Sequence, residues 1–179
     1  YGRLDDPKLP EYNYLREVDY VSGAAIMIRS QLFEDLDRFD TVFEPAYYED
    51  TDLAFKVRAA GLKVYYQPRS EVVHYEGISH GTDESTGMKR YQSENRQRFF
   101  AKWQSVLSEQ HFANGERVMK ARDRSKNKPT VLVVDHYVPH FDKDAGSRST
   151  FLYLKLLVDA GCQVKFLGDN FYQHEPYTG

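Results

Sequence analysis

Apolar residues in the first two thirds of the chain come in short runs that charged loops separate. Three of these runs have the composition of strands, and they span residues 18–29, 62–66 and 71–75. Helical spacing marks residues 31–36 and 52–60, and a longer helical region over 88–122 is interrupted at Asn114-Gly115. This mixture of strands and helices predicts an α/β fold.

The pattern changes after the charged run that ends at Pro129. Residues 123–129 are typical of a linker. Thr130 then opens an uninterrupted apolar run, which is typical of a strand buried on both faces. A helix over 151–160 and a second strand over 163–169 complete one βαβ unit, the length expected for the start of a Rossmann-like domain. We therefore predict two domains, 1–122 and 130–179, on either side of the linker.

Three carboxylates, Glu49, Asp50 and Asp52, fall within four positions at the start of the helix predicted over 52–60. Two interpretations stay open. Acids in the first turn of a helix cap its N–H groups and offset its dipole. A carboxylate that points from this position into a cleft can instead accept a proton from a nucleophilic hydroxyl. Capping needs one or two acids rather than three, and it does not require the two tyrosines that precede them.

Composition narrows the classes of function. The chain has 179 residues and a net charge of −3, which argues against a general nucleic-acid-binding protein, because such a protein carries a basic excess. The single cysteine, Cys162, excludes an internal disulfide and a cysteine-cluster zinc site. The sequence contains no run of about 18 apolar residues and no basic-then-apolar leader. These features predict a cytoplasmic protein without a membrane span.

Several short motifs follow one another over residues 12–105. In chain order they are Val21-Ser22-Gly23-Ala24, Phe39-Asp40, Glu49-Asp50-Thr51-Asp52-Leu53, Gly61, Tyr66-Gln67-Pro68, Val73-His74 and Ser79. Their order and spacing resemble the C-terminal half of a family 2 glycosyltransferase. Members of that family adopt the GT-A fold and transfer a sugar from a nucleotide-sugar donor to an acceptor hydroxyl. Most invert the anomeric centre and use a divalent metal, Mn²⁺ or Mg²⁺. The resemblance implies the same fold and reaction here, in the biosynthesis of a polysaccharide or glycan.

The resemblance also implies roles for individual residues. Asp50 matches the catalytic base, and Glu49 lies beside it in the acidic pair. His74 matches a histidine that in many relatives helps to hold the metal or the diphosphate. Gly23 matches a glycine in a strand that lines the donor and acceptor cleft, and Ser79 lies in a loop that often closes over the site. The residues alone leave other interpretations open. His74 can be a structural histidine, Gly23 can mark a simple bend, and Ser79 can lie in a plain surface loop.

Two features depart from the family pattern. Lys56 stands where relatives often have an arginine, and lysine lacks the bidentate fork that clamps phosphate or carboxylate. The family's N-terminal half, with its uridine-binding units and metal-binding Asp-x-Asp, has no counterpart, since the Asp-x-Asp matches at 35–37, 50–52 and 142–144 lie in unsuitable positions. We therefore expect a fragment of a multidomain protein that is inactive or nearly so on its own.

The tail has a resemblance of its own. The segments that carry it are Val131-Leu132-Val133-Val134-Asp135-His136-Tyr137-Val138-Pro139, Asp144-Ala145-Gly146-Ser147-Arg148 and Val164-Lys165-Phe166. They resemble the opening of a family 4 glycosyltransferase of the GT-B type. The resemblance implies that Gly146 and Arg148 approach the donor diphosphate, and N–H groups at the start of the following helix suit an anion. The alternative is a tight turn and a surface arginine.

The expected partners are a nucleotide-sugar donor and a glycan acceptor. The alternative is a non-catalytic interaction or scaffold segment, in which the acids cap a helix and exposed sheet edges favour homo-oligomers. A phosphate-handling Rossmann enzyme is a further alternative, but the tail lacks a Gly-x-Gly-x-x-Gly fingerprint. The orientation of Asp50 distinguishes the enzyme from the non-catalytic segment. If Asp50 and His74 line one cleft, the enzyme is favoured, and if both Asp50 oxygens bind helix-start amides, the cap is favoured.

Overall fold

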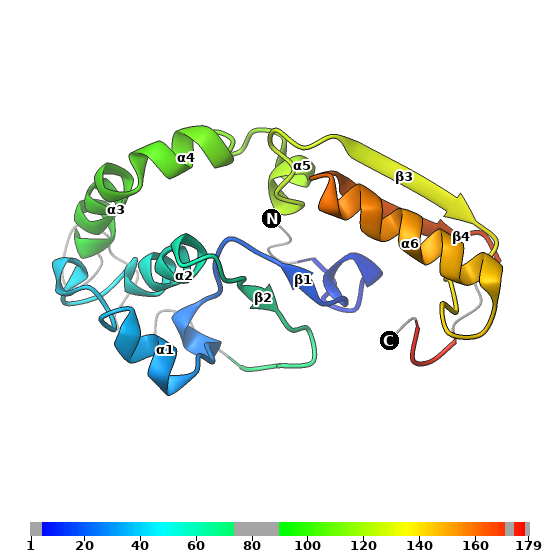
Figure 1. Cartoon of the computed structure of the whole chain (residues 1–179). Coiled ribbons are helices and arrows are strands. Elements are labelled where there is room, and N and C mark those ends of the chain that lie inside the picture. The colour runs from blue at the N-terminus through cyan, green and yellow to red at the C-terminus, as the bar shows by residue number, and fades with distance from the viewer. Residues whose placement is uncertain (1–4, 74–89, 171–173, 178–179) are drawn as a thin grey trace. The chain divides into compact units, whose positions relative to one another are not determined.

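The computed structural model describes residues 5–73, 90–170 and 174–177 (Figure 1). The chain divides into two compact units, Tyr1–Val118 and Met119–Gly179. The linker predicted over 123–129 falls inside the second unit, and the domain boundaries drawn around it stay a prediction. Helices and small sheets occur together, so the chain has a mixed α/β structure, as predicted.

The first unit is mainly helical in its described part. Its helices are α1 (Ser30–Asp35), α2 (Glu49–Ala59), α3 (Arg90–Lys102) and α4 (Gln104–Gln110). Short 3₁₀ turns lie at η1 (Pro10–Tyr12), η2 (Gly23–Ala25) and η3 (Thr41–Phe43). The strands β1 (Arg16–Glu17) and β2 (Tyr65–Tyr66) form a small antiparallel sheet, with Arg16 opposite Tyr66.

Most of the strands predicted for this unit are longer than the strands in the structure. The run over 18–29 contains the turn η2 and otherwise extended or irregular backbone, and only Tyr65–Tyr66 of the run over 62–66 pairs in a sheet. Residues 71–73 form no strand, and the rest of 71–75 lies outside the described residues. Residues that favour strands form a ladder of backbone hydrogen bonds only where another strand lies beside them. In the described part of the unit no third strand is present, and Met27 is 98% exposed.

The helices were predicted better than the strands. The helix expected over 31–36 is α1, and the helix expected over 52–60 is α2, which begins three residues earlier, at Glu49. The long helical region over 88–122 is divided into α3, α4 and α5 (Val118–Arg122). One break that was not predicted is at Trp103, whose backbone leaves the helical region at φ −107° and ψ 18°.

The core of the first unit is aromatic. Phe43, Phe55 and Phe99 are buried together, and the half-buried side chains packed against them are Tyr48, Trp103, Val106 and Leu107. The ring of Phe55 meets Phe99 edge-on with centroids 5.0 Å apart. The apolar stripe predicted on the long helical region is therefore confirmed as core packing. These apolar side chains pack α3 and α4 against α2, the helix that carries the acids.

The second unit is one βαβ unit, as predicted. The strands β3 (Thr130–Asp135) and β4 (Gln163–Gly168) are parallel, with Thr130 opposite Gln163, and α6 (Ala145–Asp159) connects them. β3 is not buried on both faces, since Leu132 and Val134 are 62% and 57% exposed. Within the described residues, α6 packs against β4, and no other helix packs closely on this sheet. Association of copies through such exposed apolar edges stays a prediction.

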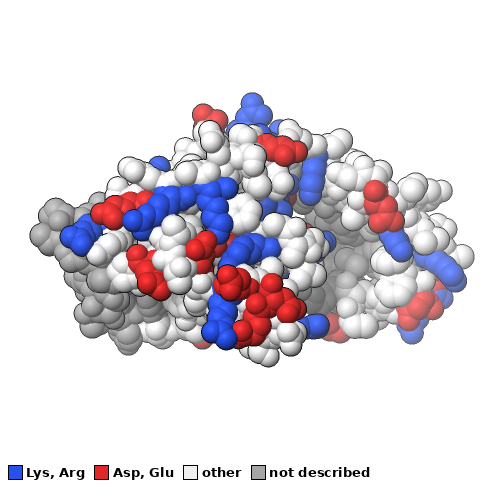
Figure 2. All heavy atoms as spheres, turned by 60° about the vertical axis from the view of Figure 1, so that its left-hand side comes forward, with Lys and Arg blue, Asp and Glu red and all other residues white. Residues whose placement is uncertain are grey.

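The surface carries both signs of charge. Lys and Arg side chains are interspersed with Asp and Glu on the face shown in Figure 2, in keeping with the small net charge of −3. Among the helices of the described ranges, none combines the length and the apolar character needed to cross a membrane.

Candidate functional site

Two residues with left-handed backbone present the acidic pair. Tyr47 and Tyr48, at φ 76° and 74°, immediately precede Glu49 and Asp50, the first two residues of α2. Tyr48 is the N-cap residue, and its side chain makes no capping hydrogen bond. Left-handed backbone costs a residue with a Cβ about 1 kcal/mol or more, and it recurs at functional sites. The chain therefore turns sharply just before the two acids, and other contacts must hold that turn.

Asp50 joins two segments that are far apart in the sequence. Its Oδ2 accepts a hydrogen bond of 2.7 Å from the N–H of Gly23, and its Oδ1 accepts from the N–H and the hydroxyl of Thr51 at 2.6 and 3.2 Å. A Cβ added at Gly23 would lie 3.3 Å from the Cβ of Asp50 and 3.4 Å from Oδ2. Because of this close approach, the position of Gly23 suits a residue without a side chain. Two of the predicted site residues thus lie together.

The hydrogen bonds of Asp50 combine features of both interpretations. Both carboxylate oxygens accept backbone N–H groups, but only that of Thr51 belongs to the start of α2. His74 and Ser79 lie outside the described residues, so the predicted cleft between Asp50 and His74 is not described. A carboxylate offers about four acceptor positions, and the described residues supply three donors here. Oδ2 therefore keeps the capacity to accept one more hydrogen bond.

Glu49 is half-buried beside Asp50. Burial raises the pKa of its carboxyl group, its own backbone N–H partly offsets this effect, and the charge of Asp50 adds to the rise. Its Oε2 is buried and has no hydrogen-bond partner in the described structure. An ionised carboxylate in such a place destabilises the folded state, and groups of this kind are concentrated at functional sites.

We expect Glu49→Gln to raise the stability of the folded chain at neutral pH. A raised pKa means that the folded state binds the proton of Glu49 more tightly than the unfolded state does, so stability is lost as the pH rises and the group ionises. Glutamine resembles the protonated form at every pH. The gain should be present at pH 7 and disappear below about pH 4.3, the ordinary pKa of glutamate. Thermal unfolding at both pH values measures it.

The exposed Glu116 supplies the matched control, since Glu116→Gln should leave the melting temperature nearly unchanged at either pH. A lower melting temperature for Glu49→Gln at pH 7 would show that the ionised carboxylate stabilises the fold.

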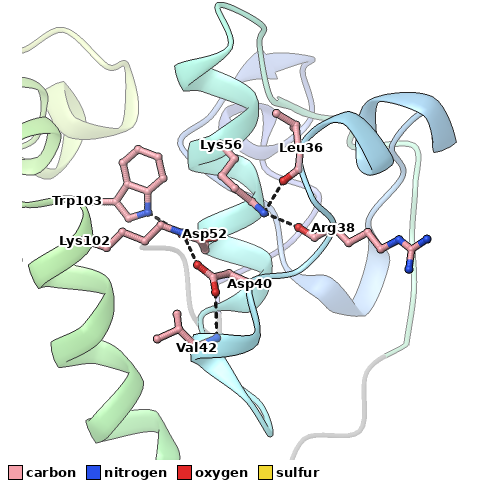
Figure 3. Close-up of polar contacts among 8 residues, drawn as sticks. All are labelled: Leu36, Arg38, Asp40, Val42, Asp52, Lys56, Lys102 and Trp103. Atoms are coloured by element: carbon pink, nitrogen blue, oxygen red, sulfur yellow. Dashed lines mark hydrogen bonds and ion pairs between the residues drawn. The ribbon is translucent and has the colours of Figure 1, made fainter.

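The third acid, Asp52, is structural. Its side chain is fully buried, and its Oδ1 accepts a hydrogen bond of 2.7 Å from the indole N–H of Trp103. The Nζ of Lys102 lies 2.7 and 2.9 Å from the two carboxylate oxygens, and it also contacts Oδ2 of Asp40 at 2.8 Å (Figure 3). Asp52 therefore ties α2 to the end of α3. Sequence reasoning missed this cluster, although the charged Lys102 directly before the only tryptophan was a signal.

Lys102 and Asp40 each shift the pKa of the other toward the charged form. Burial alone lowers the pKa of Lys102, but its hydrogen bonds to Asp40 and Asp52 outweigh burial, and the pKa is raised. The hydrogen bond from Lys102, followed by that from the N–H of Val42, lowers the pKa of Asp40. Because Lys102 and Asp40 stabilise each other's ionised forms, this cluster suits an anchor rather than a proton donor.

Lys56 binds backbone carbonyls rather than an anion in this structure. Its Nζ donates to the carbonyl oxygens of Leu36, at 2.8 Å, and of Arg38 (Figure 3). These carbonyls follow α1, where Asp37 and Arg38 have left-handed backbone. The ammonium group thus binds two carbonyls of the turn that follows α1.

The two site residues predicted in the tail lie on the first turn of α6, in the second unit. Arg148 is exposed, and a Cβ added at Gly146 would lie 3.2 Å from Oδ1 of Asp144. Asp144 caps the helix by accepting from the N–H and hydroxyl of Ser147 at 2.8 and 2.7 Å, and these bonds lower its pKa. An anion at this turn would meet the negative charge of Asp144, so the helix start is less favourable for a diphosphate than the motif implied.

The described residues do not form a metal site. Over residues 5–73, 90–170 and 174–177, no group of three or more His, Cys, Asp or Glu side chains is placed to hold a metal ion. His74, the predicted ligand, lies outside these ranges. A divalent metal therefore stays a prediction for the full-length protein.

Comparison with known proteins gives a partial match to the same enzyme in two bacterial strains. The chain is 34% identical over 68 residues to the N-acetylglucosaminyl-diphospho-decaprenol L-rhamnosyltransferase of Mycobacterium tuberculosis, in the strains CDC 1551 / Oshkosh and ATCC 25618 / H37Rv. The matched segment is 38% of this chain, and it spans only 22% of the length of these relatives. No protein-family model and no solved structure matches the chain. The match supports a distant relationship to glycosyltransferases and no finer assignment.

Proposed function

We propose that the chain is part of a glycosyltransferase, in which the first unit belongs to a GT-A domain that transfers a sugar from a nucleotide-sugar donor to an acceptor hydroxyl with inversion. The observation that carries the proposal is Asp50, which is half-buried at the start of α2 and fixed by the N–H of Gly23. The partial match to a rhamnosyltransferase supports the same class of reaction.

In the proposed reaction, the acceptor hydroxyl oxygen bonds to the anomeric carbon while the bond from that carbon to the diphosphate breaks. The hydroxyl proton passes to Asp50, and the nucleoside diphosphate leaves with the electron pair of the broken bond. Asp50 suits the role of base because two backbone N–H groups fix it and the described residues leave one acceptor position of Oδ2 free. Glu49 lies beside it as the second acid of the pair.

The remaining sequence predictions belong to this proposal. In the full-length protein, His74 would be a ligand of the divalent metal, which would stabilise the departing diphosphate. Ser79, Gly146 and Arg148 would contact the donor, the last two through the family 4-like tail. The acceptor would be a glycan, in the biosynthesis of a polysaccharide or other glycan.

A non-catalytic role for the segment is the second candidate. The observation in its favour is that Oδ1 of Asp50 binds the N–H of Thr51 at the start of α2, as a capping residue does. Asp52, the neighbouring acid, is likewise occupied by structural contacts.

The test is turnover by the full-length natural protein. A panel of nucleotide sugars, which includes an activated rhamnose, is incubated with Mn²⁺ or Mg²⁺ and N-acetylglucosaminyl-diphospho-lipid, and the release of nucleoside diphosphate is measured. We expect release that depends on one donor and on the acceptor, stops when a chelator is added and resumes with excess Mn²⁺. No acceptor-dependent release with any donor would favour the non-catalytic candidate.

A further inference from the structure

We propose that Asn95, on α3, is a positioning residue that fixes the left-handed turn from which Glu49 and Asp50 are presented. The catalytic consequence of this role rests on the proposed function, whereas its geometric consequence does not. Sequence reasoning placed Asn95 within a helical region and gave it no role.

Asn95 binds three carbonyl groups of one loop. Its side chain is fully buried, and Nδ2 lies 2.6, 2.8 and 3.0 Å from the carbonyl oxygens of Phe43, Ala46 and Tyr47. Its Oδ1 accepts a hydrogen bond of 2.8 Å from Nη1 of Arg98, which also donates to the carbonyl of Val42 at 2.9 Å. Carbonyl oxygens only accept, so the amide nitrogen must face the loop and the amide oxygen must face the arginine. Every polar atom of the side chain therefore has a partner.

The carbonyl of Tyr47 connects Asn95 to the acids. This carbonyl and the N–H of Tyr48 lie in one rigid peptide plane, and that plane joins the two residues with left-handed backbone. The next carbonyl, of Tyr48, accepts the first hydrogen bond of α2, from the N–H of Asp52 at 2.8 Å. Fixing the plane between Tyr47 and Tyr48 therefore fixes the direction in which α2 begins, two residues before Asp50.

Packing alone does not explain an asparagine here. Tyr91, Asn95 and Phe99 follow one another at four-residue spacing on the same face of α3, and Phe99 is in the aromatic core. An apolar side chain would suit core packing at the central position and would avoid the desolvation of an amide. The amide instead supplies donors to carbonyls that the irregular loop cannot pair within a helix or sheet. The polar side chain of Asn95 thus stabilises the conformation of the loop.

The test uses Asn95→Asp in the full-length protein, because aspartate keeps the shape and removes both donors. Hydrogen exchange of the Gly23 N–H reports on Asp50, since that N–H binds its Oδ2. We expect the protection of this amide to fall about tenfold while the amides in the middle of α2 keep theirs. We also expect kcat for sugar transfer to fall about 100-fold, with the donor KM within about twofold.

Asn13→Asp is the matched control, because Asn13 also donates to two loop carbonyls of the first unit, those of Pro7 and Leu9 at 2.7 and 2.9 Å. It should leave Gly23 protection and kcat unchanged. If Gly23 protection in Asn95→Asp equals that in the control, or falls together with that of all α2 amides, the positioning role is overturned. If the wild-type protein transfers no sugar, the proposed function fails, and Gly23 protection alone decides the positioning role.

A second variant covers the outcome that Asn95→Asp does not fold. Arg98→Met keeps the amide nitrogen of Asn95 facing the three carbonyls. It removes the partner of Asn95 Oδ1, together with the hydrogen bond from Arg98 to the carbonyl of Val42. We expect a smaller loss of Gly23 protection in the same direction, and protection equal to that of Asn13→Asp would overturn the proposal.

Discussion

Asp50→Asn is expected to lower the rate of sugar transfer by the full-length protein about 10²- to 10⁴-fold, the range that a general base contributes. Asparagine keeps the shape of the side chain, but its amide cannot take the proton of the acceptor hydroxyl. Its single oxygen can accept from either Gly23 or Thr51 and not from both, so stability should fall by about 1 kcal/mol. Initial rates at saturating donor measure the first effect, and calorimetric titration of the donor checks that binding persists.

Two variants show whether the loss is specific to Asp50. Asp35→Asn changes an exposed aspartate of α1 whose Oδ1 accepts from Gln31 at 2.8 Å, and it should leave transfer unchanged. Glu49→Gln should lower transfer less than Asp50→Asn, because Glu49 is the neighbour of the base. Unchanged transfer in Asp50→Asn would mean that Asp50 is a cap and that any activity belongs to other residues.

Local patterns predicted the helices of this chain because the periodicity of an apolar helix face is visible in a short stretch of sequence. The βαβ unit of the tail was predicted for the same reason, since each of its elements carries its own signal. The run over 18–29 was overpredicted as a strand, because a strand depends on a neighbour that the run itself does not specify. The burial of β3 on both faces failed similarly, since it required elements on both sides of the sheet.

The acids show the same limit at the level of the site. Sequence spacing does not distinguish Glu49, Asp50 and Asp52. In the described structure, however, Oε2 of the half-buried Glu49 has no partner, Asp50 binds Gly23 and Asp52 is fully buried. The contacts of Asp52 come from Lys102 and Trp103, at the end of α3 and about 50 positions away in the sequence. Contacts over such a separation depend on how two helices pack, so neither Asn95 nor Lys102 could be assigned from the chain alone. The family resemblance gave Gly23 and Asp50 separate roles at a site, and neither it nor any local rule predicted the contact between them.

Lys102→Met is expected to lower the free energy of unfolding by about 3 kcal/mol, the largest effect on stability that we predict. The carboxylate of Asp52 is fully buried, and among the described residues the one hydrogen-bond donor left to it without Lys102 is the indole N–H of Trp103. Removing one partner of a buried ion pair costs about 3–5 kcal/mol, because a charge is left uncompensated. The lower end applies here since the side chain of Lys102 is 33% exposed and water can enter the space that it leaves. Urea unfolding at pH 7 measures the change.

Lys63→Met is the matched control, because Lys63 forms an exposed pair with Glu17 at 3.4 Å, and the loss there should be within about 0.5 kcal/mol. The double variant Asp52→Asn with Lys102→Met separates charge from packing. Asparagine removes the buried charge and can still accept from Trp103, so the double variant should be more stable than Lys102→Met alone. If the double variant is the less stable of the two, lost packing around the lysine stem explains the effect, and the anchor between α2 and α3 is not electrostatic.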